Sequence, residues 1–528
     1  MEGLERSESR QDDVRLRDGV ESADGSGDPL RETQWALECA SRIMKAKKAV
    51  SDRQLGALLA GERKIARVEQ RLHEKEEALT RLLEAQVRID PMPGDSRPET
   101  LSCAISVIIP VKNGGETFAE LLRRIRSQRK VGEVEILVLD SDSTDDSAAV
   151  AGSFGCRVIR IPQREFNHGA TRDIGAGQAK GDFLVFTVQD ALPVSNYWLY
   201  GMVSPFWSVP DLGAVTSKQF TRPEADLFSL WANDATNAMI GFEGDSVYGL
   251  SPSFDFSVWK HFDPLTKRRV SFLDNVSSCI PKSVYGEVPF RPLINAEDMD
   301  LGIRMLEKGK RLGFLTSTGV FHWHERGPDY VLKRHYIGTK ANLYVMENDL
   351  PRFYEVQDID WRTFAANVAD LLDLVTLALP EPEAVDPAPV KAASAFVSSF
   401  RRHFDAAPEE VSAALGRVGG SCNARLEASC PGIFGNVDLL PGERHRFRKN
   451  FLVASFLSGV DAFTGFLSGR QLSYKGREEE FGICIRKILA SVVGEAAGAY
   501  YLESETRGAL TEEQKRMDRL LAKGVCSF

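Results

Sequence analysis

The feature that most constrains the fold is an alternation of apolar, β-rich runs with amphipathic helical patterns between residues 105 and 190. The runs are ISVIIP (105–110), EILVLD (135–140), RVIRI (157–161) and DFLVFTVQD (182–190). Strands that alternate with helices at this spacing form right-handed β-α-β units in a parallel sheet. Helices then cover both faces of the sheet, so buried strands read as continuous apolar runs. The sequence therefore predicts an α/β domain with a mainly parallel sheet.

The rest of the chain divides by composition and rhythm. The predicted order is a disordered tail at 1–30, a helical arm at 31–89, a Pro-rich linker at 90–103, the α/β domain at 104–349, and a mainly helical region at 350–528 with a Pro-rich loop at 379–393. In the arm, Leu58, Ile65, Leu72 and Leu79 repeat every seven residues. This spacing fits either a coiled coil that forms a homo-oligomer or a helix packed on its own domain.

Charge and cysteine content exclude several classes of protein. Lys and Arg total 66 and Asp and Glu total 75, a net charge of −9, whereas a general nucleic-acid binder shows a basic footprint. The eight cysteines include no C-x-x-C pair, which argues against a disulfide framework and fits a reducing compartment. We find no signal peptide, and no apolar run of the roughly 18 residues that would span a bilayer. We expect a cytoplasmic protein in which 451–469 is a buried or interfacial helix.

Polar residues follow three of the predicted strands. These segments are Pro110-Val111-Lys112-Asn113, Asp140-Ser141-Asp142-Ser143 and Gln189-Asp190-Ala191. Ligands bind beyond the carboxyl ends of strands in such sheets, so the three segments predict one shared crevice. Alternatively, each is an ordinary turn that ends a strand. Neither a G-x-G-x-x-G fingerprint nor a P-loop is present, so the crevice is not a dinucleotide or P-loop site.

Four ordered motifs resemble a known family. They are ISVIIPVKNGG, LVLDSDSTDDS, FNHGATRDIGAGQAKGDFLVFTVQDALP and AEDMDLGIRMLEKG, and together they resemble inverting glycosyltransferases of family 2, which have the GT-A fold. FNHGATRD and QDALP most resemble bacterial rhamnosyltransferases. The resemblance covers about residues 104–345.

The resemblance implies a nucleotide-sugar site. Its residues would be Pro110, Lys112 and Asn113 after the first strand, Asp140 and Asp142 after the second, Thr171 and Arg172 on the next helix, and Gln189 and Asp190 after the fourth strand. Asp140 would contact the nucleobase. Arg172 would pair with a diphosphate oxygen, or alternatively form a surface salt bridge.

The family's D-x-D motif, which holds a divalent cation such as Mg²⁺ or Mn²⁺, reads Gln189-Asp190-Ala191 here. Asp190 is thus the only carboxylate of the motif, and one can suffice when phosphate oxygens and waters complete the shell. His322 and His324 match a position that can supply a further ligand, and their spacing on a strand puts both on one face. They are equally well interpreted as hydrogen-bonded structural histidines.

Glu297-Asp298 matches the family's catalytic-base motif, which assigns Asp298 as the base that deprotonates the acceptor hydroxyl. Acidic residues also favour a helix N-terminus for purely structural reasons.

The resemblance therefore predicts an inverting transferase that moves L-rhamnose from dTDP-rhamnose to a cell-surface glycan or lipid-linked glycan. Two alternatives are the same chemistry with a UDP-hexose donor, and a weakly catalytic member that acts as an assembly scaffold. The basic, apolar segment 445–457 also suggests peripheral contact with the inner membrane.

Overall fold

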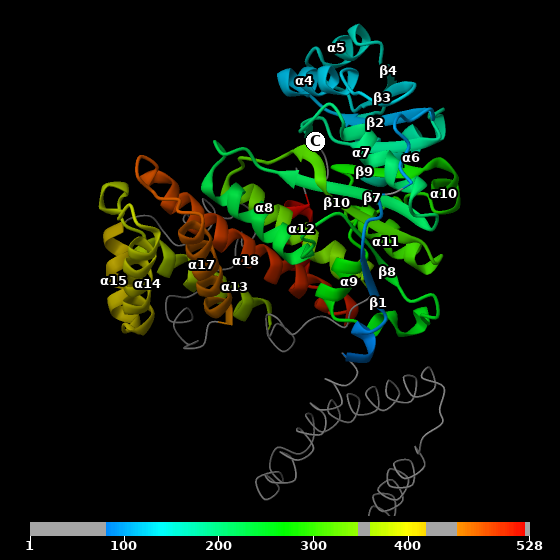
Figure 1. Cartoon of the computed structure of the whole chain (residues 1–528). Helices are drawn as coiled ribbons and strands as arrows, with labels where there is room; N and C mark the ends of the chain where they lie inside the picture. Colours follow the sequence, from blue (N-terminus) through cyan, green and yellow to red (C-terminus); the bar gives the residue numbers. More distant parts are fainter. Residues whose placement is uncertain (1–80, 95, 347–359, 419–450, 523–528) are drawn as a thin grey trace, which may run out of the picture. The chain divides into compact units, whose positions relative to one another are not determined.

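The computed structural model describes residues 81–94, 96–346, 360–418 and 451–522. The chain divides into two compact units, one containing residues 1–87 and 251–262 and the other containing 88–250 and 263–528. In the first unit, the Ser251 backbone N–H donates to the Gln86 carbonyl, and the Phe254 ring contacts the rings of Phe256 and Phe262. The second unit holds all the residues of the predicted site, and Figure 1 shows the strands of the sheet around which it is built.

The centre of the second unit is a ten-stranded mixed sheet in the order β1-β8-β10-β7-β9-β5-β2-β3-β4, with β6 paired to β10. The strands are β1 (Val87–Pro91), β2 (Ile105–Val111), β3 (Val134–Asp140), β4 (Arg157–Arg160), β5 (Phe183–Thr187), β6 (Leu192–Pro193), β7 (Leu212–Phe220), β8 (Ser246–Leu250), β9 (Ser277–Pro281) and β10 (Arg311–Phe321). The predicted strands form the parallel set β5-β2-β3-β4. All seven residues of β2 are buried, as the continuous apolar run requires.

Antiparallel strands interrupt the parallel arrangement, and β6 and β8 both run antiparallel to β10. β9 lies between β5 and β7 and runs antiparallel to both, while β7 and β10 are parallel to each other. This GT-A arrangement agrees with the predicted fold class. It brings the carboxyl ends of β5, β7 and β10 to one edge of the sheet, which is where the predicted site residues follow.

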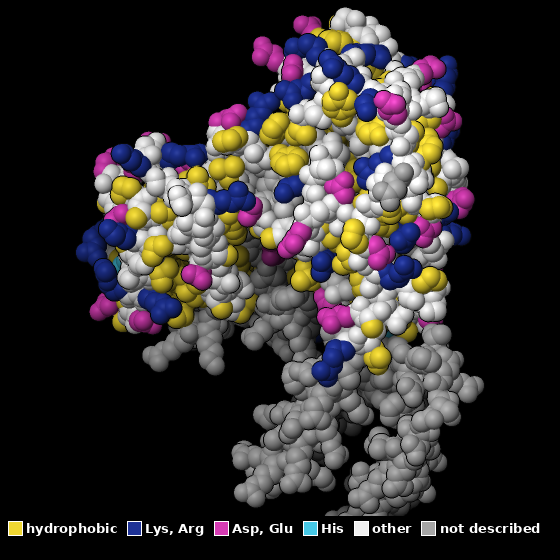
Figure 2. Space-filling view, viewed as in Figure 1, with side chains coloured by type: hydrophobic (Ala, Val, Ile, Leu, Met, Phe, Trp, Pro, Cys, Tyr) yellow, Lys and Arg dark blue, Asp and Glu magenta, His cyan; other side chains and the backbone are white. Residues whose placement is uncertain are grey.

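Helices surround the sheet. They are α4 (Gly115–Arg126), α5 (Ser147–Ser153), α6 (His168–Gln178), α7 (Trp198–Val203), α8 (Leu227–Ile240), α9 (Pro264–Val270), α10 (Lys282–Glu287), α11 (Glu297–Glu307) and α12 (Pro328–Val345). α4 buries Phe118, Leu121, Leu122 and Ile125 and carries arginines in its last turn. Figure 2 shows Lys and Arg side chains over the α4 end of the face in view, with Asp and Glu side chains among them.

The C-terminal helices are α13 (Trp361–Ala378), α14 (Pro389–Asp405), α15 (Pro408–Val418), α17 (Phe451–Gly469), α18 (Glu478–Thr506) and α19 (Glu512–Leu521). Among them, α17, α18 and α19 pack on α12 or α8, and α13, α14 and α15 pack on one another and on α17 and α18. α18 lies against α12 (Figure 1) because Gly494 and Gly498 allow their backbones to approach. A Cβ at Gly494 would lie 2.4 Å from the Leu332 carbonyl oxygen. The helical region is therefore a direct support of α12, the helix that follows the predicted histidines.

Two predicted boundaries differ from the structure. The segment 90–103 begins inside β1 and buries Met92 and Leu101, because its few apolar side chains pack into the core next to the sheet. The Pro-rich loop ends at residue 388, since Pro389 occupies the first turn of α14, a position that proline favours. Most of the heptad pattern lies outside the described residues, so the coiled-coil arm stays a prediction.

The expectation that no apolar segment is long enough to cross a bilayer is wrong on length and composition. α17 has 19 residues with a mean hydropathy of 1.5, and it is the one such helix in the part of the chain that the structure describes. Its most apolar face, with Phe456 at its centre, packs against Phe396 and Phe400 of α14. Leu452 and Phe456 of the predicted membrane-contact segment are fully buried and are not available to a lipid surface. Residues 445–450 lie outside the described residues.

Candidate active site

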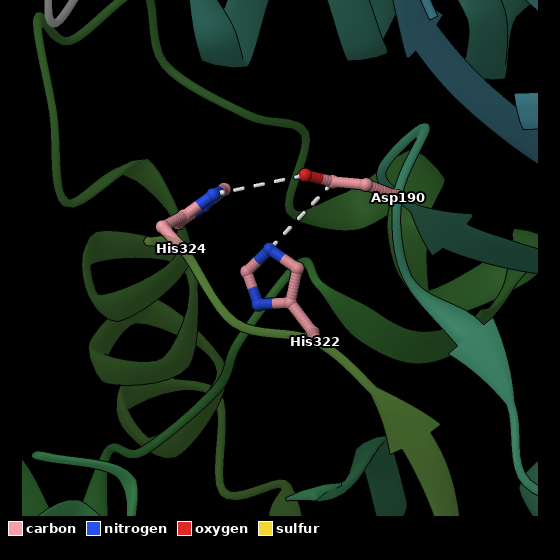
Figure 3. A group of neighbouring side chains, drawn as sticks. All are labelled: Asp190, His322 and His324. Atoms are coloured by element: carbon pink, nitrogen blue, oxygen red, sulfur yellow. Dashed lines mark ion pairs between the residues drawn. The ribbon is translucent and has the colours of Figure 1, made fainter. Parts of the chain in front are cut away.

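Asp190 and the two histidines after β10 form one cluster (Figure 3). The His322 Nε2 atom lies 3.7 Å from Asp190 Oδ1, and the His324 Nδ1 atom lies 3.7 Å from Asp190 Oδ2. One ligand atom from each residue lies within 4.8 Å of the other two. The β10–β7 pairing carries the histidines to the strand end beside Asp190. The structure thus brings together the three residues that the sequence predicted as metal ligands.

Both histidines of the cluster favour the neutral form. Burial lowers the pKa of His322 although Asp190 opposes this effect. Burial and then the neighbouring His322 lower the pKa of His324 to about 4. Neutral imidazoles keep a nitrogen lone pair, which is the form that coordinates a metal. Two such nitrogens and one carboxylate are a donor set that fits a divalent transition ion such as Mn²⁺.

The Gln189 side chain is not part of the Asp190, His322 and His324 cluster and binds the Lys112 backbone instead. Its Oε1 atom accepts from the Lys112 backbone N–H at 2.7 Å, and its Nε2 donates to the Lys112 carbonyl at 3.1 Å. The side-chain amide therefore joins the end of β5 to the end of β2, which a carboxylate could not do because it has no donor. This geometry does not support the prediction that Gln189 contacts the ligand. Glutamine suits this position better than aspartate, because only an amide can both accept from and donate to the Lys112 backbone.

The loops after β2 and β3 are joined to each other. Asn113 accepts from the Thr144 backbone N–H at 2.7 Å, and the Lys112 ammonium donates to the Asp142 carbonyl. Asn113 and Asp142 have φ values of 51° and 54°, a left-handed conformation that asparagine and aspartate tolerate better than most residues. Asp142 also accepts from the Gln163 backbone N–H at 2.8 Å. These residues shape the predicted nucleotide crevice.

Asp140 is one of two predicted site residues with a buried polar atom that has no hydrogen-bond partner among the described residues, the other being Arg172 through its Nε. Asp140 ends β3 and is buried, and its Oδ1 has no hydrogen-bond partner in the described part of the chain. A buried carboxylate oxygen without a donor is costly, and a nucleobase N–H is one group that would satisfy it. Pro110, by contrast, is buried within β2 opposite Leu139, so it shapes the strand end.

Arg172 and Thr171 have internal partners. The Arg172 guanidinium donates to Glu297 Oε1 at 3.1 Å, and both side chains are buried. This is neither the surface salt bridge nor the diphosphate contact that the sequence suggested, since α6 directs Arg172 toward α11. The Thr171 hydroxyl accepts from the Asn167 backbone N–H at 3.2 Å. The Thr171 contact therefore stabilises the start of α6, and the Arg172 contact joins α6 to α11.

Asp298 lies in the first turn of α11, which begins at Glu297 after a strained residue. Ala296, the residue that precedes the helix, has a φ of 62°, an uncommon conformation for alanine that turns the chain sharply into the helix. The Asp298 carboxylate accepts from the Met299 backbone N–H at 2.9 Å. Burial, then the charges of Glu297 and Asp274, raise the pKa of Asp298 to about 8. The pKa of Glu297 is lowered despite its burial, because Arg172 and His168 stabilise its charge. Two adjacent carboxyl groups thus have opposite shifts.

The sequence analysis did not identify four residues of this region, which are Gln219, Arg268, Asp274 and Arg334. Gln219 on β7 contacts both His322 and Asp274, at 2.7 and 2.5 Å. Arg334 of α12 acts on the pKa of Asp274 and of both clustered histidines, and Arg268 of α9 interacts electrostatically with Asp274 and Asp298. Residues 196–290 show no regular alternation of strand and helix patterns, so nothing in the sequence singled out Gln219, Arg268 and Asp274. The KRH triplet after FHWHERG was the available signal for Arg334.

Residues 106–229 match the family described as "Glycosyl transferase family 2". The O-antigen chain rhamnosyltransferase WbaN of Salmonella anatum is 25% identical over 241 residues, which are 44% of this chain and 70% of that protein. RfbN of Salmonella typhimurium, with the same description, is 24% identical over 239 residues, again 44% and 70%. Among solved structures, the mannosyltransferase PcManGT of Pyrobaculum calidifontis superposes with a TM-score of 0.38 at 14% identity, covering 76% of this chain and 90% of that one.

Proposed function

Because the chain is a glycosyltransferase with a family 2 domain that resembles O-antigen rhamnosyltransferases, we propose that it transfers L-rhamnose from dTDP-rhamnose to a hydroxyl of a cell-surface glycan, with inversion at the anomeric carbon. The observation that carries the proposal is that one sheet edge holds both a set of metal-ligand side chains, Asp190, His322 and His324, and a carboxyl group with a raised pKa, Asp298. A transferase that neutralises the leaving diphosphate with a cation and deprotonates the acceptor hydroxyl with a base would use both groups.

The metal site would be formed by Asp190, His322 and His324. A divalent cation bound there would neutralise charge on the departing nucleoside diphosphate. Two imidazole nitrogens suit Mn²⁺ better than Mg²⁺, which prefers oxygen ligands. Arg326 and Arg334 act electrostatically on His324, so their positive charges lie close enough to assist in binding a diphosphate.

Asp298 would act as the general base. With a pKa of about 8, its carboxylate is a stronger base than an ordinary aspartate and still ionises near neutral pH. It would accept the proton of the acceptor hydroxyl while that oxygen attacks the anomeric carbon, and the nucleoside diphosphate leaves from the opposite face. Arg172 and Glu297 would hold the first turn of α11 in place, since their buried ion pair joins it to α6.

The donor is tested by nucleoside diphosphate release from dTDP-rhamnose and a panel of UDP-sugars, each with Mn²⁺, Mg²⁺ or chelator. We expect release from dTDP-rhamnose that Mn²⁺ supports best and chelator abolishes. Release from a UDP-hexose alone would keep the chemistry and reject the rhamnosyl donor. If no nucleotide sugar in the panel releases nucleoside diphosphate and calorimetry detects no donor binding, the enzyme hypothesis is rejected and the scaffold alternative is favoured.

A matched pair of variants tests the metal site. His324→Ala should weaken Mn²⁺-supported release by at least tenfold, because it removes one of three ligands. His403→Ala, on α14 and outside the site, should leave release unchanged. Equal activity of the two variants would contradict the proposed ligand set.

A further inference from the structure

Gln219 connects the histidine cluster to a second carboxylate. It lies near the end of β7, opposite Val320 of the neighbouring strand β10. Its Oε1 is 2.7 Å from His322 Nδ1, and its Nε2 is 2.5 Å from Asp274 Oδ2. The other Asp274 oxygen accepts from the Val276 backbone N–H at 2.9 Å. Gln219 is therefore held between two side chains by both of its polar atoms.

The chemistry of Asp274 fixes which way the Gln219 amide points. Burial raises the pKa of Asp274, and the hydrogen bonds from Val276 and Gln219 and the charge of Arg334 oppose this shift by favouring the ionised form. In that form the carboxylate can only accept hydrogen bonds, so the atom of Gln219 that faces it is the amide nitrogen. The carbonyl oxygen of the same amide then faces His322 Nδ1, and an oxygen can only accept. Nδ1 must consequently carry the hydrogen of the imidazole.

This assignment determines the free lone pair of His322. A neutral imidazole has one N–H and one unprotonated nitrogen, so a hydrogen on Nδ1 leaves the lone pair on Nε2. Nε2 is the atom that points toward Asp190, at 3.7 Å. With the opposite tautomer, Nε2 would present a hydrogen to the cluster and could not bind a cation.

We propose that Gln219 is a positioning residue, which takes its orientation from Asp274 and holds His322 in the tautomer whose Nε2 coordinates a divalent cation. The inference rests on the proposed metal site for its consequence, although the tautomer itself does not depend on that site. Partners of this kind orient metal-ligating histidines and raise their basicity, and their loss typically lowers metal affinity about 10- to 100-fold.

Three substitutions test the proposal. Gln219→Leu removes both hydrogen bonds at similar volume. Gln219→Glu keeps an acceptor for the Nδ1 hydrogen and loses the donor to Asp274. Gln128→Leu is the matched control, because this partly buried glutamine bonds to the backbone of Arg124, Ser195 and Leu199, away from the cluster. Thermal unfolding first verifies that each variant is folded.

The first readout is the ¹⁵N spectrum of the histidine side chains in the metal-free full-length chain at neutral pH, with His322 assigned by substitution. We expect Nε2 to be unprotonated in the wild type, in Gln219→Glu and in Gln128→Leu, and a shift toward Nε2–H in Gln219→Leu. A wild-type His322 protonated on Nε2, or a tautomer unchanged in Gln219→Leu, would overturn the proposal.

The second readout is Mn²⁺ affinity, measured by electron paramagnetic resonance in the presence of dTDP. Gln219→Leu should bind Mn²⁺ about 10- to 100-fold more weakly, and Gln219→Glu and Gln128→Leu should stay within about threefold of the wild type. If His322→Ala loses affinity and Gln219→Leu does not, the positioning role is wrong and the metal site stands. If the wild type binds no Mn²⁺, the proposed metal site fails, and the ¹⁵N spectrum alone decides the tautomer.

Discussion

Replacing Asp298 with asparagine separates a catalytic role from a structural one. The substitution keeps the shape of the side chain and an oxygen that can accept from the Met299 backbone N–H, and it removes the group that accepts a proton. General-base catalysis contributes about 10²- to 10⁴-fold. We therefore expect glycosyl transfer by Asp298→Asn to fall by this factor, with donor affinity unchanged.

The pH profile gives the magnitude. With a pKa of about 8, roughly one tenth of the Asp298 side chains are ionised at pH 7, half at pH 8 and nine tenths at pH 9. Wild-type kcat/KM should thus rise about fivefold from pH 7 to 8 and less than twofold from pH 8 to 9. The residual activity of Asp298→Asn should lack this rise.

Stability provides an independent measure of the same group. The pKa of Asp298 is raised in the folded state from 3.8 to about 8, so its protonation stabilises the fold at low pH, and this contribution is lost as pH rises through about 8. Four pKa units set an upper limit of about 6 kcal/mol. Because solvent reaches the half-buried side chain, we expect on the order of 2 kcal/mol.

Asp298→Asn should accordingly gain stability relative to the wild type between pH 4 and 8, even though it loses activity. Thermal unfolding across this range measures the gain. A variant that keeps full activity would refute the base assignment. A variant that loses stability equally at every pH would refute the reasoning about its buried charge.

Three further substitutions test the supports of the site. Gln189→Asp should destabilise the chain by about 1–3 kcal/mol in denaturant unfolding, because it loses the donor that joins two strand ends, and a tenfold gain in Mn²⁺ affinity would contradict this interpretation. Arg172→Met should cost about 3–5 kcal/mol, because Glu297 is left as an unpaired buried charge, and adding Glu297→Gln should recover much of the loss. Gly494→Ala should lower the Tm because its Cβ meets the α12 backbone, whereas Gly465→Ala in α17, which has no atom within 4 Å of such a Cβ, should not.

The local pattern of the chain was sufficient to predict the parallel part of the sheet. The runs around Ile108, Leu137 and Val185 are buried on both faces and carry their signal in consecutive residues. The position of Glu297-Asp298 at a helix N-terminus was suggested by the motif itself and agrees with α11, which begins at Glu297. The antiparallel strand β9 was not predicted, because its pairing with β5 and β7 depends on residues distant in sequence.

Local motifs were enough to predict the fold class and the family resemblance and to single out Asp190, His322, His324 and Asp298 as candidates. The surroundings of these residues became known from the three-dimensional fold. The pairing of Arg172 with Glu297 spans 125 positions, and that of Gln219 with His322 spans 103. Burial, like-charge proximity and hydrogen-bond direction arise from such distant contacts, and they set the pKa and the tautomer on which the proposed chemistry depends.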